Sequence, residues 1–216
     1  MEKCLKKKIA IIGMGPGHRD FLLPAAAREI ERADILAGAP RHLEEFSASG
    51  KETYEFGADL PGLARFLKSA RESKRAAVLA SGDPAFYGIL KYLRKFFAPG
   101  ELDVFPGLSS FQYLFSRLGE DWQDAELLSL HGREADFTGA VKRGKKVVLL
   151  TDKKNTPQAA ARRLLDAGLG DTRMVIGSRL SYGDESIIRT TAAEAAAGEY
   201  PALSVVILYG EKYEQG

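Results

Sequence analysis

The sequence contains almost no cysteine, because Cys4 is the single one among 216 residues. A lone thiol cannot form an internal disulfide, so we expect a protein of a reducing compartment and predict that it is cytoplasmic. Histidine is nearly as rare: His18, His42 and His131 lie far apart in the sequence and lack the spacing of a zinc site. We therefore expect neither a disulfide framework nor a resident metal ion.

The sequence also lacks a strong excess of either charge and any long apolar run. It contains 31 Lys and Arg residues against 29 Asp and Glu residues, for a net charge of +2. Nucleic-acid-binding proteins usually carry a marked basic excess, so we expect no nucleic-acid partner. The apolar run Ile9–Ile12 ends in glycines and is too short for a signal peptide or a membrane span, so we expect no membrane contact.

Common nucleophile and nucleotide motifs are missing too. There is no G-x-S-x-G elbow and no G-x-x-x-x-G-K phosphate loop. The segment "GMGPGH" begins like a dinucleotide fingerprint, but His18 stands where the third glycine is required and Pro16 removes a backbone donor. Ala39 and Pro40 stand where an acidic residue should follow the second strand. An NAD site is therefore disfavoured, which leaves a close backbone approach or a simple tight turn.

Short β-branched runs alternate with helical patterns in the first half of the chain. Strands are predicted at residues 8–13, 34–38, 76–81 and 101–106, and helices at 24–33, 61–74, 85–97 and 110–119. Strands joined by helical crossovers are typical of a mostly parallel sheet with helices on both faces.

The pattern changes after the polar, turn-rich segment 119–126. Strands are predicted at 125–132, 145–152, 172–180, 185–192 and 203–210, and a helix at 156–168 with Thr156 as N-cap and Pro157 at its first position. Directly linked strands indicate antiparallel neighbours and a mixed sheet. We predict an α/β protein of two domains, an N-terminal domain of residues 1–120 and a C-terminal domain of residues 121–216.

Polar or glycine-rich segments follow four of the predicted strands. "SGDP" contains Asp83, which taken alone is more simply an N-cap; "PGLSSFQ" contains two serines, of which capping explains one; "SLHGR" ends with His131 and Arg133 beside Gly132. The carboxyl ends of parallel strands meet at one edge of a sheet, where open α/β sheets bind ligands. Together with "GMGPG", these segments predict a ligand site at that edge.

Three of these segments, "GMGPG", "SGDPAFYG" and "PGLSSFQ", resemble in this order the tetrapyrrole methylases. This resemblance implies a class III methyltransferase fold, with two α/β domains and a cleft between them. The stretches 106–133 and 178–187 are similar to the CbiE-type branch, which methylates C-5 of cobalt-precorrin-7 in cobalamin synthesis and corresponds to the N-terminal part of the fused CobL-type precorrin-6Y C5,15-methyltransferase. A methylase of another substrate on the same fold, or a nucleotide-binding module, remains an alternative.

The resemblance implies S-adenosyl-L-methionine as cofactor and S-adenosyl-L-homocysteine as product. Carried over by position, the cofactor contacts fall on Pro16, Ser81, Gly82, Asp83, Phe86, Ser109, Ser110, Thr151, Leu180 and Ser181. Many relatives continue the first loop with an acidic residue and "LT", whereas this chain has His18 and "LLP" there.

The expected corrin substrate carries many carboxylates, so we expect cations near the site. The candidates for substrate binding are Arg41, His42, Arg133 and Arg179. Methyl transfer depends mainly on orientation, and His131 is the candidate for a weak catalytic base. The family commonly forms homodimers, which we expect here. Because the chain ends at Gly216, we also expect a stand-alone subunit with a separate CbiT-type partner for C-15 methylation and decarboxylation.

Overall fold

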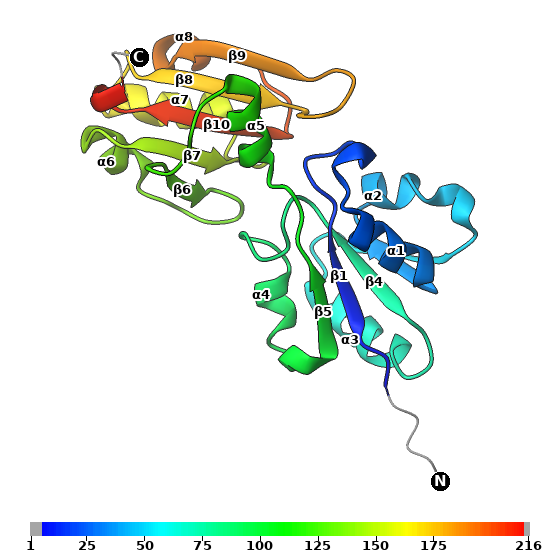
Figure 1. The fold of residues 1–216 in the computed structure, drawn as a ribbon. Coiled ribbons are helices and arrows are strands. Elements are labelled where there is room, and N and C mark those ends of the chain that lie inside the picture. Colours follow the sequence, from blue (N-terminus) through cyan, green and yellow to red (C-terminus); the bar gives the residue numbers. More distant parts are fainter. Residues whose placement is uncertain (1–5, 214–216) are drawn as a thin grey trace. The chain divides into compact units, whose positions relative to one another are not determined.

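The structure is a computed structural model that describes residues 6–213, so Cys4 lies outside the described residues. Contacts divide the chain into two compact units, Met1–Ser109 and Ser110–Gly216, and each is built on a five-stranded sheet. In Figure 1 the first unit runs from blue to green and the second from green to red. Within the described residues, no helix is long and apolar enough to cross a bilayer.

The sheet of the first unit is parallel throughout, with strand order β3-β2-β4-β1-β5. Its strands are β1 (Ile9–Gly13), β2 (Ile35–Gly38), β3 (Glu52–Glu55), β4 (Ala76–Ala80) and β5 (Leu102–Phe105). Its α-helices are α1 (Pro24–Arg32), α2 (Pro40–Glu44), α3 (Leu60–Ala70) and α4 (Leu90–Leu93), and its 3₁₀ helices are η1 (Arg19–Phe21), η2 (Ser47–Ser49) and η3 (Pro99–Glu101). The four predicted strands are confirmed. β3, a short edge strand, and α2 were not predicted from the sequence.

Helices cover both faces of this sheet, as predicted. Ile12 and Leu79 face α1 in one apolar cluster, whereas Ile11 and Val78 face α3 and α4 in another. Neighbouring residues of a strand point to opposite faces, so an uninterrupted apolar run such as "IAIIG" supplies both clusters.

The helix predicted at residues 85–97 is wrong at both ends, because the α-helix is confined to α4. The Asp83 carboxylate accepts the backbone N–H groups of Ala85 (2.7 Å) and Phe86 (3.2 Å), and Tyr87 has a φ of 51°. A side chain that bonds the nearby backbone competes with the helical hydrogen bonds. The chain therefore makes a tight loop before the helix begins at Leu90.

The second sheet is mixed, with strand order β6-β7-β10-β8-β9. Its strands are β6 (Glu126–Ser129), β7 (Lys146–Leu150), β8 (Arg173–Ser178), β9 (Ser186–Thr191) and β10 (Ser204–Tyr209). Its helices are α5 (Ser110–Leu118), α6 (Phe137–Lys142), α7 (Pro157–Asp166), α8 (Ala192–Ala195) and the 3₁₀ helix η4 (Glu211–Tyr213). β6 and β7 are parallel and the other pairs antiparallel, which confirms the predicted mixed sheet. The Thr156 cap is confirmed as well, whereas α6 and α8 were not predicted.

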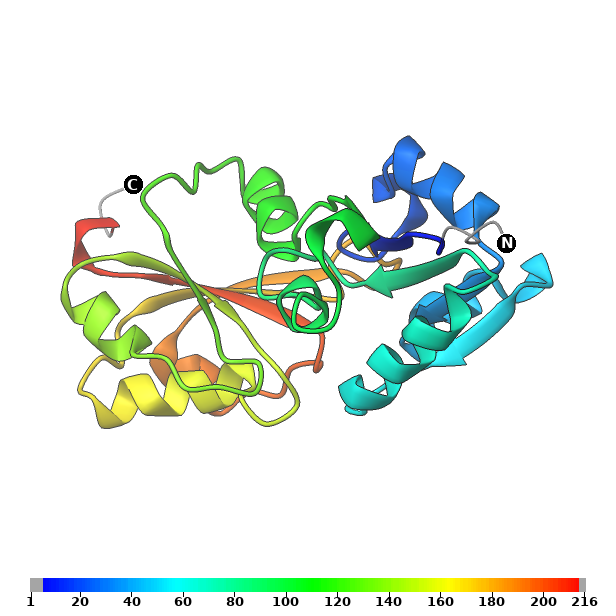
Figure 2. The same cartoon turned by 90° about the horizontal axis from the view of Figure 1, so that it is seen from below.

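Helices lie on both faces of the second sheet too. The side chains of α6, α7 and α8 share one apolar cluster with the strands. Figure 2 shows α6 and α7 on one face and α5 on the other. On that other face a Cβ at Gly177 would lie 2.9 Å from the Leu114 side chain, so α5 packs closely on β8.

Helix α5 belongs to the second unit, so the structure divides the chain before this helix, not after residue 120. The buried Lys146 of β7 explains part of this attachment. Its Nζ lies 5.5 Å from the centre of the Phe115 ring of α5 and 3.2 Å from the Asp121 carbonyl oxygen. The polar segment 119–126 is therefore a loop within the second unit, although its composition suggested a boundary.

Candidate functional site

The loops after β1, β4 and β5 touch one another at the carboxyl edge of the first sheet. Gly82 donates its N–H to the Gly15 carbonyl at 2.9 Å. A Cβ at Gly107 would lie 2.2 Å from the Gly82 carbonyl oxygen, and one at Gly13 would lie 2.4 Å from the Gly107 nitrogen. Such contacts exclude any side chain, so only glycine permits this backbone approach. The structure thus brings three of the predicted segments together.

Asp83 joins two of these loops. Besides holding the turn at Ala85 and Phe86 with one oxygen, its carboxylate accepts the Gly107 N–H with the other at 3.2 Å. The carboxylate therefore does not cap α4, which begins only at Leu90. An ionised carboxylate has about four acceptor positions, so roughly one remains for a donor group of a ligand.

Two residues of α2 converge on Ser81. The Ser81 hydroxyl contacts the Arg41 guanidinium and lies 3.0 Å from Nε2 of His42. Ser81 and Arg41 are exposed, whereas His42 is only 2% exposed. Burial, with a smaller contribution from Arg41, lowers the pKa of His42 from 6.5 to about 4. His42 is therefore neutral near pH 7 and reaches this edge of the sheet through Ser81.

The stability of the first unit should depend on pH through His42. Because the unfolded ring binds a proton near pH 6.5 and the folded ring only near pH 4, its contribution is complete above pH 6.5 and is lost as the pH falls to 4. Between pH 7 and 4 we expect the wild-type chain to lose about 3 kcal/mol more unfolding free energy than His42→Leu. Urea unfolding at several pH values measures this difference. Parallel pH profiles of the two proteins would contradict the expectation.

The other cofactor residues predicted in the first unit surround the same loops. Pro16 is partly buried between Gly15 and Gly17. Phe86 follows the Asp83 turn, and Ser109 is 5% exposed at the end of the loop after β5. Ser110, the next residue, begins α5 and is the first residue of the second unit.

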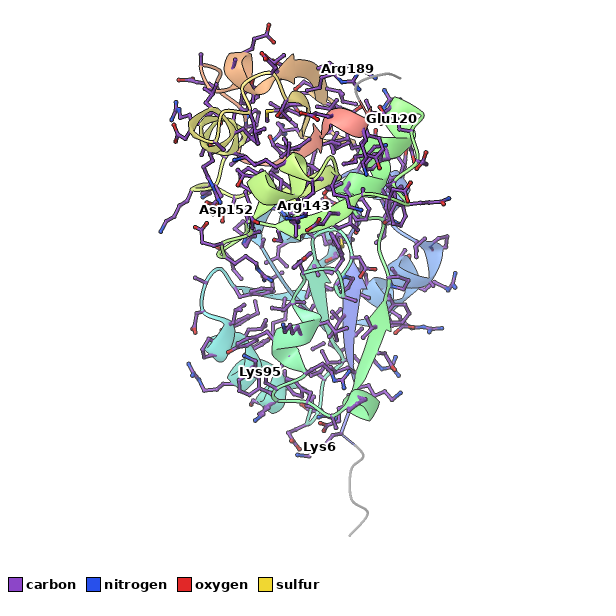
Figure 3. The ribbon with its side chains drawn as sticks, turned by 90° about the vertical axis from the view of Figure 1, so that its left-hand side faces the viewer. Lys6, Lys95, Glu120, Arg143, Asp152 and Arg189 are labelled. Carbon is purple, nitrogen blue, oxygen red and sulfur yellow. The ribbon has the colours of Figure 1, made fainter. Side chains whose placement is uncertain are left out.

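In the second unit, a second aspartate joins the loops after β6 and β7. Asp152, labelled in Figure 3, accepts the Gly132 N–H at 2.9 Å with one oxygen. With the other oxygen it accepts the N–H groups of Lys154 (2.8 Å) and Asn155 (2.7 Å). The hydrogen bond from the Asn155 backbone is the largest influence that lowers the pKa of Asp152, to about 2. Asp83 and Asp152 thus play matching roles in the two units.

Three predicted residues lie on these two loops. His131 and Arg133 are exposed beside Gly132, after β6. Thr151, after β7, is buried, and its hydroxyl donates to the Ser204 carbonyl at 2.6 Å. Since this hydroxyl hydrogen is already used, the Thr151 side chain serves the packing of β7 against the start of β10.

The remaining predicted residues lie between β8 and β9. Arg179 (φ 47°) and Ser181 (φ 69°) both adopt the left-handed conformation, which is uncommon outside glycine and is enriched at active sites and ligand clamps. Asp184 pairs with Nε of Arg179 at 2.5 Å, and Glu185 accepts the Ser181 N–H at 2.6 Å. Leu180, between the two strained residues, is 4% exposed.

Several residues that organise these loops were not predicted from the sequence. They are Asp152, Asn155, Asp184 and Glu185. The position of Asp152 directly after an apolar strand repeats that of Asp83 and was a usable signal. Glu185 was not marked as clearly, because only its Ser181 partner lies in the same loop, whereas Arg117 belongs to α5. Within residues 6–213, no group of three His, Cys, Asp or Glu side chains is placed to hold a metal ion.

The chain is similar to known proteins over most of its length. The family described as tetrapyrrole (corrin/porphyrin) methylases matches residues 8–196. The cobalt-precorrin-7 C(5)-methyltransferase of Salmonella typhimurium (strain LT2) is 40% identical over 200 residues, 93% of this chain and 98% of that protein. The probable cobalt-precorrin-7 C(5)-methyltransferase of Methanocaldococcus jannaschii is 31% identical over 211 residues, 94% of this chain and 99% of that protein.

Two solved structures share the fold. The precorrin-6Y methylase (cbiE) of Archaeoglobus fulgidus matches with a TM-score of 0.73 and 24% identity, over 94% of this chain and 97% of that chain. The uroporphyrin-III C-methyl transferase of Thermus thermophilus complexed with S-adenyl homocysteine matches with a TM-score of 0.75 and 22% identity, over 94% of this chain and 92% of that chain. At these identities the likeness concerns the fold.

Proposed function

Since the chain belongs to the tetrapyrrole (corrin/porphyrin) methylase family, we propose that it methylates C-5 of a corrin precursor of the cobalt-precorrin-7 type in cobalamin biosynthesis, with S-adenosyl-L-methionine as methyl donor. The chain is a methyltransferase by this membership. The identity of 40% over nearly the full length of the Salmonella typhimurium relative carries the choice of substrate.

The loops of the first unit fit such a donor. The contacts among Gly13, Gly82 and Gly107 hold the three loops against one another at this edge of the sheet, and the remaining acceptor position of Asp83 suits an ammonium or hydroxyl donor. S-Adenosylmethionine supplies an activated methyl group, whose bond to sulfur breaks as the corrin carbon provides the new electron pair. Because the donor is already activated, the residues mainly need to orient the reactants, an effect worth up to ~7–11 kcal/mol of the barrier.

We propose the following roles for the site residues that were predicted from the sequence. In the first unit, Pro16, Ser81, Gly82, Asp83, Phe86 and Ser109 hold the cofactor. In the second unit, Ser110, Leu180 and Ser181 are further cofactor contacts, and Thr151 contributes through its backbone because its hydroxyl is bound to Ser204. His131 is our candidate for the group that takes up the proton lost from the corrin, since its imidazole is exposed.

Basic side chains supply partners for the corrin carboxylates. Burial raises the pKa of the Glu45 carboxyl, and the charges of three nearby basic side chains oppose this rise. They are Arg19, His18 and Arg41. Arg133 is exposed after β6, and Arg179 is held by Asp184. We propose Arg41, Arg133 and Arg179 as substrate contacts, because guanidinium groups match carboxylates in shape and charge. His42 is buried, so we assign it an indirect role.

We also propose a cytoplasmic homodimer. Since the proposed reaction leaves C-15 unmethylated, a separate CbiT-type enzyme would complete the methylation and decarboxylation there.

A direct assay tests the proposed function. The purified chain, given S-adenosylmethionine with a ¹³C-labelled methyl group and candidate corrin precursors, should place the label on C-5, as NMR of the product reports. Calorimetry should show binding of S-adenosylhomocysteine and none of NAD. Label on another carbon would point to a different methylase of the family, and a failure to bind S-adenosylhomocysteine would contradict the proposal altogether.

A further inference from the structure

The Ser81 hydroxyl has two nitrogen neighbours, and their hydrogen bonds decide what else it can bind. Nη2 of Arg41 is one of them. An arginine guanidinium carries only donors, so this contact occupies one of the two acceptor positions of the hydroxyl oxygen. Nε2 of His42, 3.0 Å away, is the other neighbour and can either donate or accept.

The buried side of the His42 ring distinguishes these two cases. Nδ1 is buried and has no hydrogen-bond partner among residues 6–213. If Ser81 donated to Nε2, the single hydrogen of the neutral ring would lie on Nδ1 as a buried, unpaired N–H, which proteins rarely tolerate. If Nε2 donates to Ser81, Nδ1 is only an unprotonated acceptor. The second arrangement leaves a weaker group unpaired.

We propose that Arg41 and His42 fill both acceptor positions of Ser81, so that its hydroxyl can only donate and is held to bind a carboxylate of the ligand. Ser81 and Arg41 are exposed side by side, and a hydroxyl donor next to a guanidinium charge selects an anionic oxygen over an ammonium group. His42 is then a positioning residue that acts through Ser81. This inference rests on the proposed function, which supplies the carboxylate from the amino-acid end of the donor or from the corrin side chains.

The hydrogen position on His42 can be observed directly. The chain has three histidines, so an ¹⁵N-histidine sample should give resolvable ring signals in a long-range ¹H–¹⁵N correlation spectrum. We expect the His42 ring to show a protonated Nε2 and an unprotonated Nδ1 at pH 7. A hydrogen on Nδ1 would overturn the inference even if the enzyme has the proposed activity, because Ser81 would then donate to the ring.

Two binding measurements distinguish the sources of the carboxylate. Ser81→Ala should weaken the binding of the carboxylate ligand about tenfold or more, as expected for a lost hydrogen bond to a charged group. A higher Kd for S-adenosylhomocysteine identifies the donor's carboxylate, and a higher KM for the corrin with unchanged kcat identifies a substrate carboxylate. Ser69→Ala, which removes an exposed hydroxyl from α3 of the same unit, should change neither constant.

If both constants of Ser81→Ala equal those of an active wild-type enzyme, the inference fails and the proposed function stands. If the wild-type chain neither binds S-adenosylhomocysteine nor methylates a corrin, both fail together.

A pair of His42 variants separates positioning from simple packing. The amide nitrogen of His42→Gln can still donate to Ser81, whereas His42→Leu fills much of the same space without a donor. For the ligand identified with Ser81→Ala, we expect the affinity of His42→Gln to lie within about threefold of the wild-type value and that of His42→Leu to be about tenfold weaker. Circular dichroism should show that both variants are folded. Equal affinities of the two variants would show that the ring only fills space and would overturn the positioning role.

Discussion

Gly107→Ala is expected to cost about 3 kcal/mol or more of unfolding free energy and to abolish S-adenosylhomocysteine binding. A Cβ at this position would lie 2.2 Å from the Gly82 carbonyl oxygen and 2.8 Å from two backbone atoms of Gly13. All of these atoms belong to the backbone that continues β1 and β4, and the pairing of β1 with β4 and β5 prevents the loops from moving apart independently. The clash must therefore displace loops that we propose hold the cofactor.

Gly100→Ala provides the matched control. Gly100 lies in the same unit, before β5, and a Cβ there would meet no atom within 4 Å. Its unfolding free energy should stay within about 0.5 kcal/mol of the wild-type value. Urea unfolding followed by circular dichroism gives the stabilities, and calorimetry gives the affinities. Wild-type values for Gly107→Ala would show that the loop contacts are not as tight as the structure describes.

Asp83→Asn should weaken S-adenosylhomocysteine binding on the order of 100-fold while the chain stays folded. The substitution keeps the shape of the side chain but replaces one acceptor oxygen by an amide group that can only donate. If Asn retains the bonds from Ala85 and Phe86, its NH₂ group faces the Gly107 N–H, donor against donor. The link between the loops after β4 and β5 is then lost, together with the charge proposed to attract the ligand.

Asp34→Asn tests whether this effect belongs to the site. Asp34 also accepts a backbone N–H across two loops, that of Arg75 at 2.8 Å, but it precedes β2 and so lies at the opposite edge of the same sheet. We expect a smaller loss of stability, because the amide oxygen of Asn can keep this single bond, and an unchanged affinity for S-adenosylhomocysteine. If both variants lose affinity equally, the loss reports general destabilisation and the proposed role of Asp83 is refuted.

The predicted elements were most accurate where the pattern depends on local chemistry or on burial along a strand. α7 begins at Pro157 with the Thr156 side chain bonded to the Ala159 N–H, as the capping signal indicated. Prediction failed where a side chain bonds a distant or competing backbone group. The helix expected from residue 85 begins only at Leu90, because the Asp83 carboxylate bonds the backbone before it. Helix α6 was not predicted, because it is a short amphipathic segment between two strands.

The candidate site shows the same division. The glycine-rich and polar strand ends of the first unit lie together at one edge of its sheet, and the motif order indicated the family that the comparisons show. The partners of these residues were not predictable. The sequence indicated that His42 is a surface residue that could face a substrate. In the structure it is buried behind Ser81, because α2 packs its His42 side against the sheet.

By itself, the sequence determined the apolar strands, the parallel and mixed character of the two sheets, and the family, since all of these depend on the order of residues along the chain. Only the tertiary structure decided that Asp83 binds Gly107, that Asp152 binds Gly132, and that α5 joins the second unit. A hydrogen bond between loops depends on distances across a folded sheet, and no local pattern of residues encodes them.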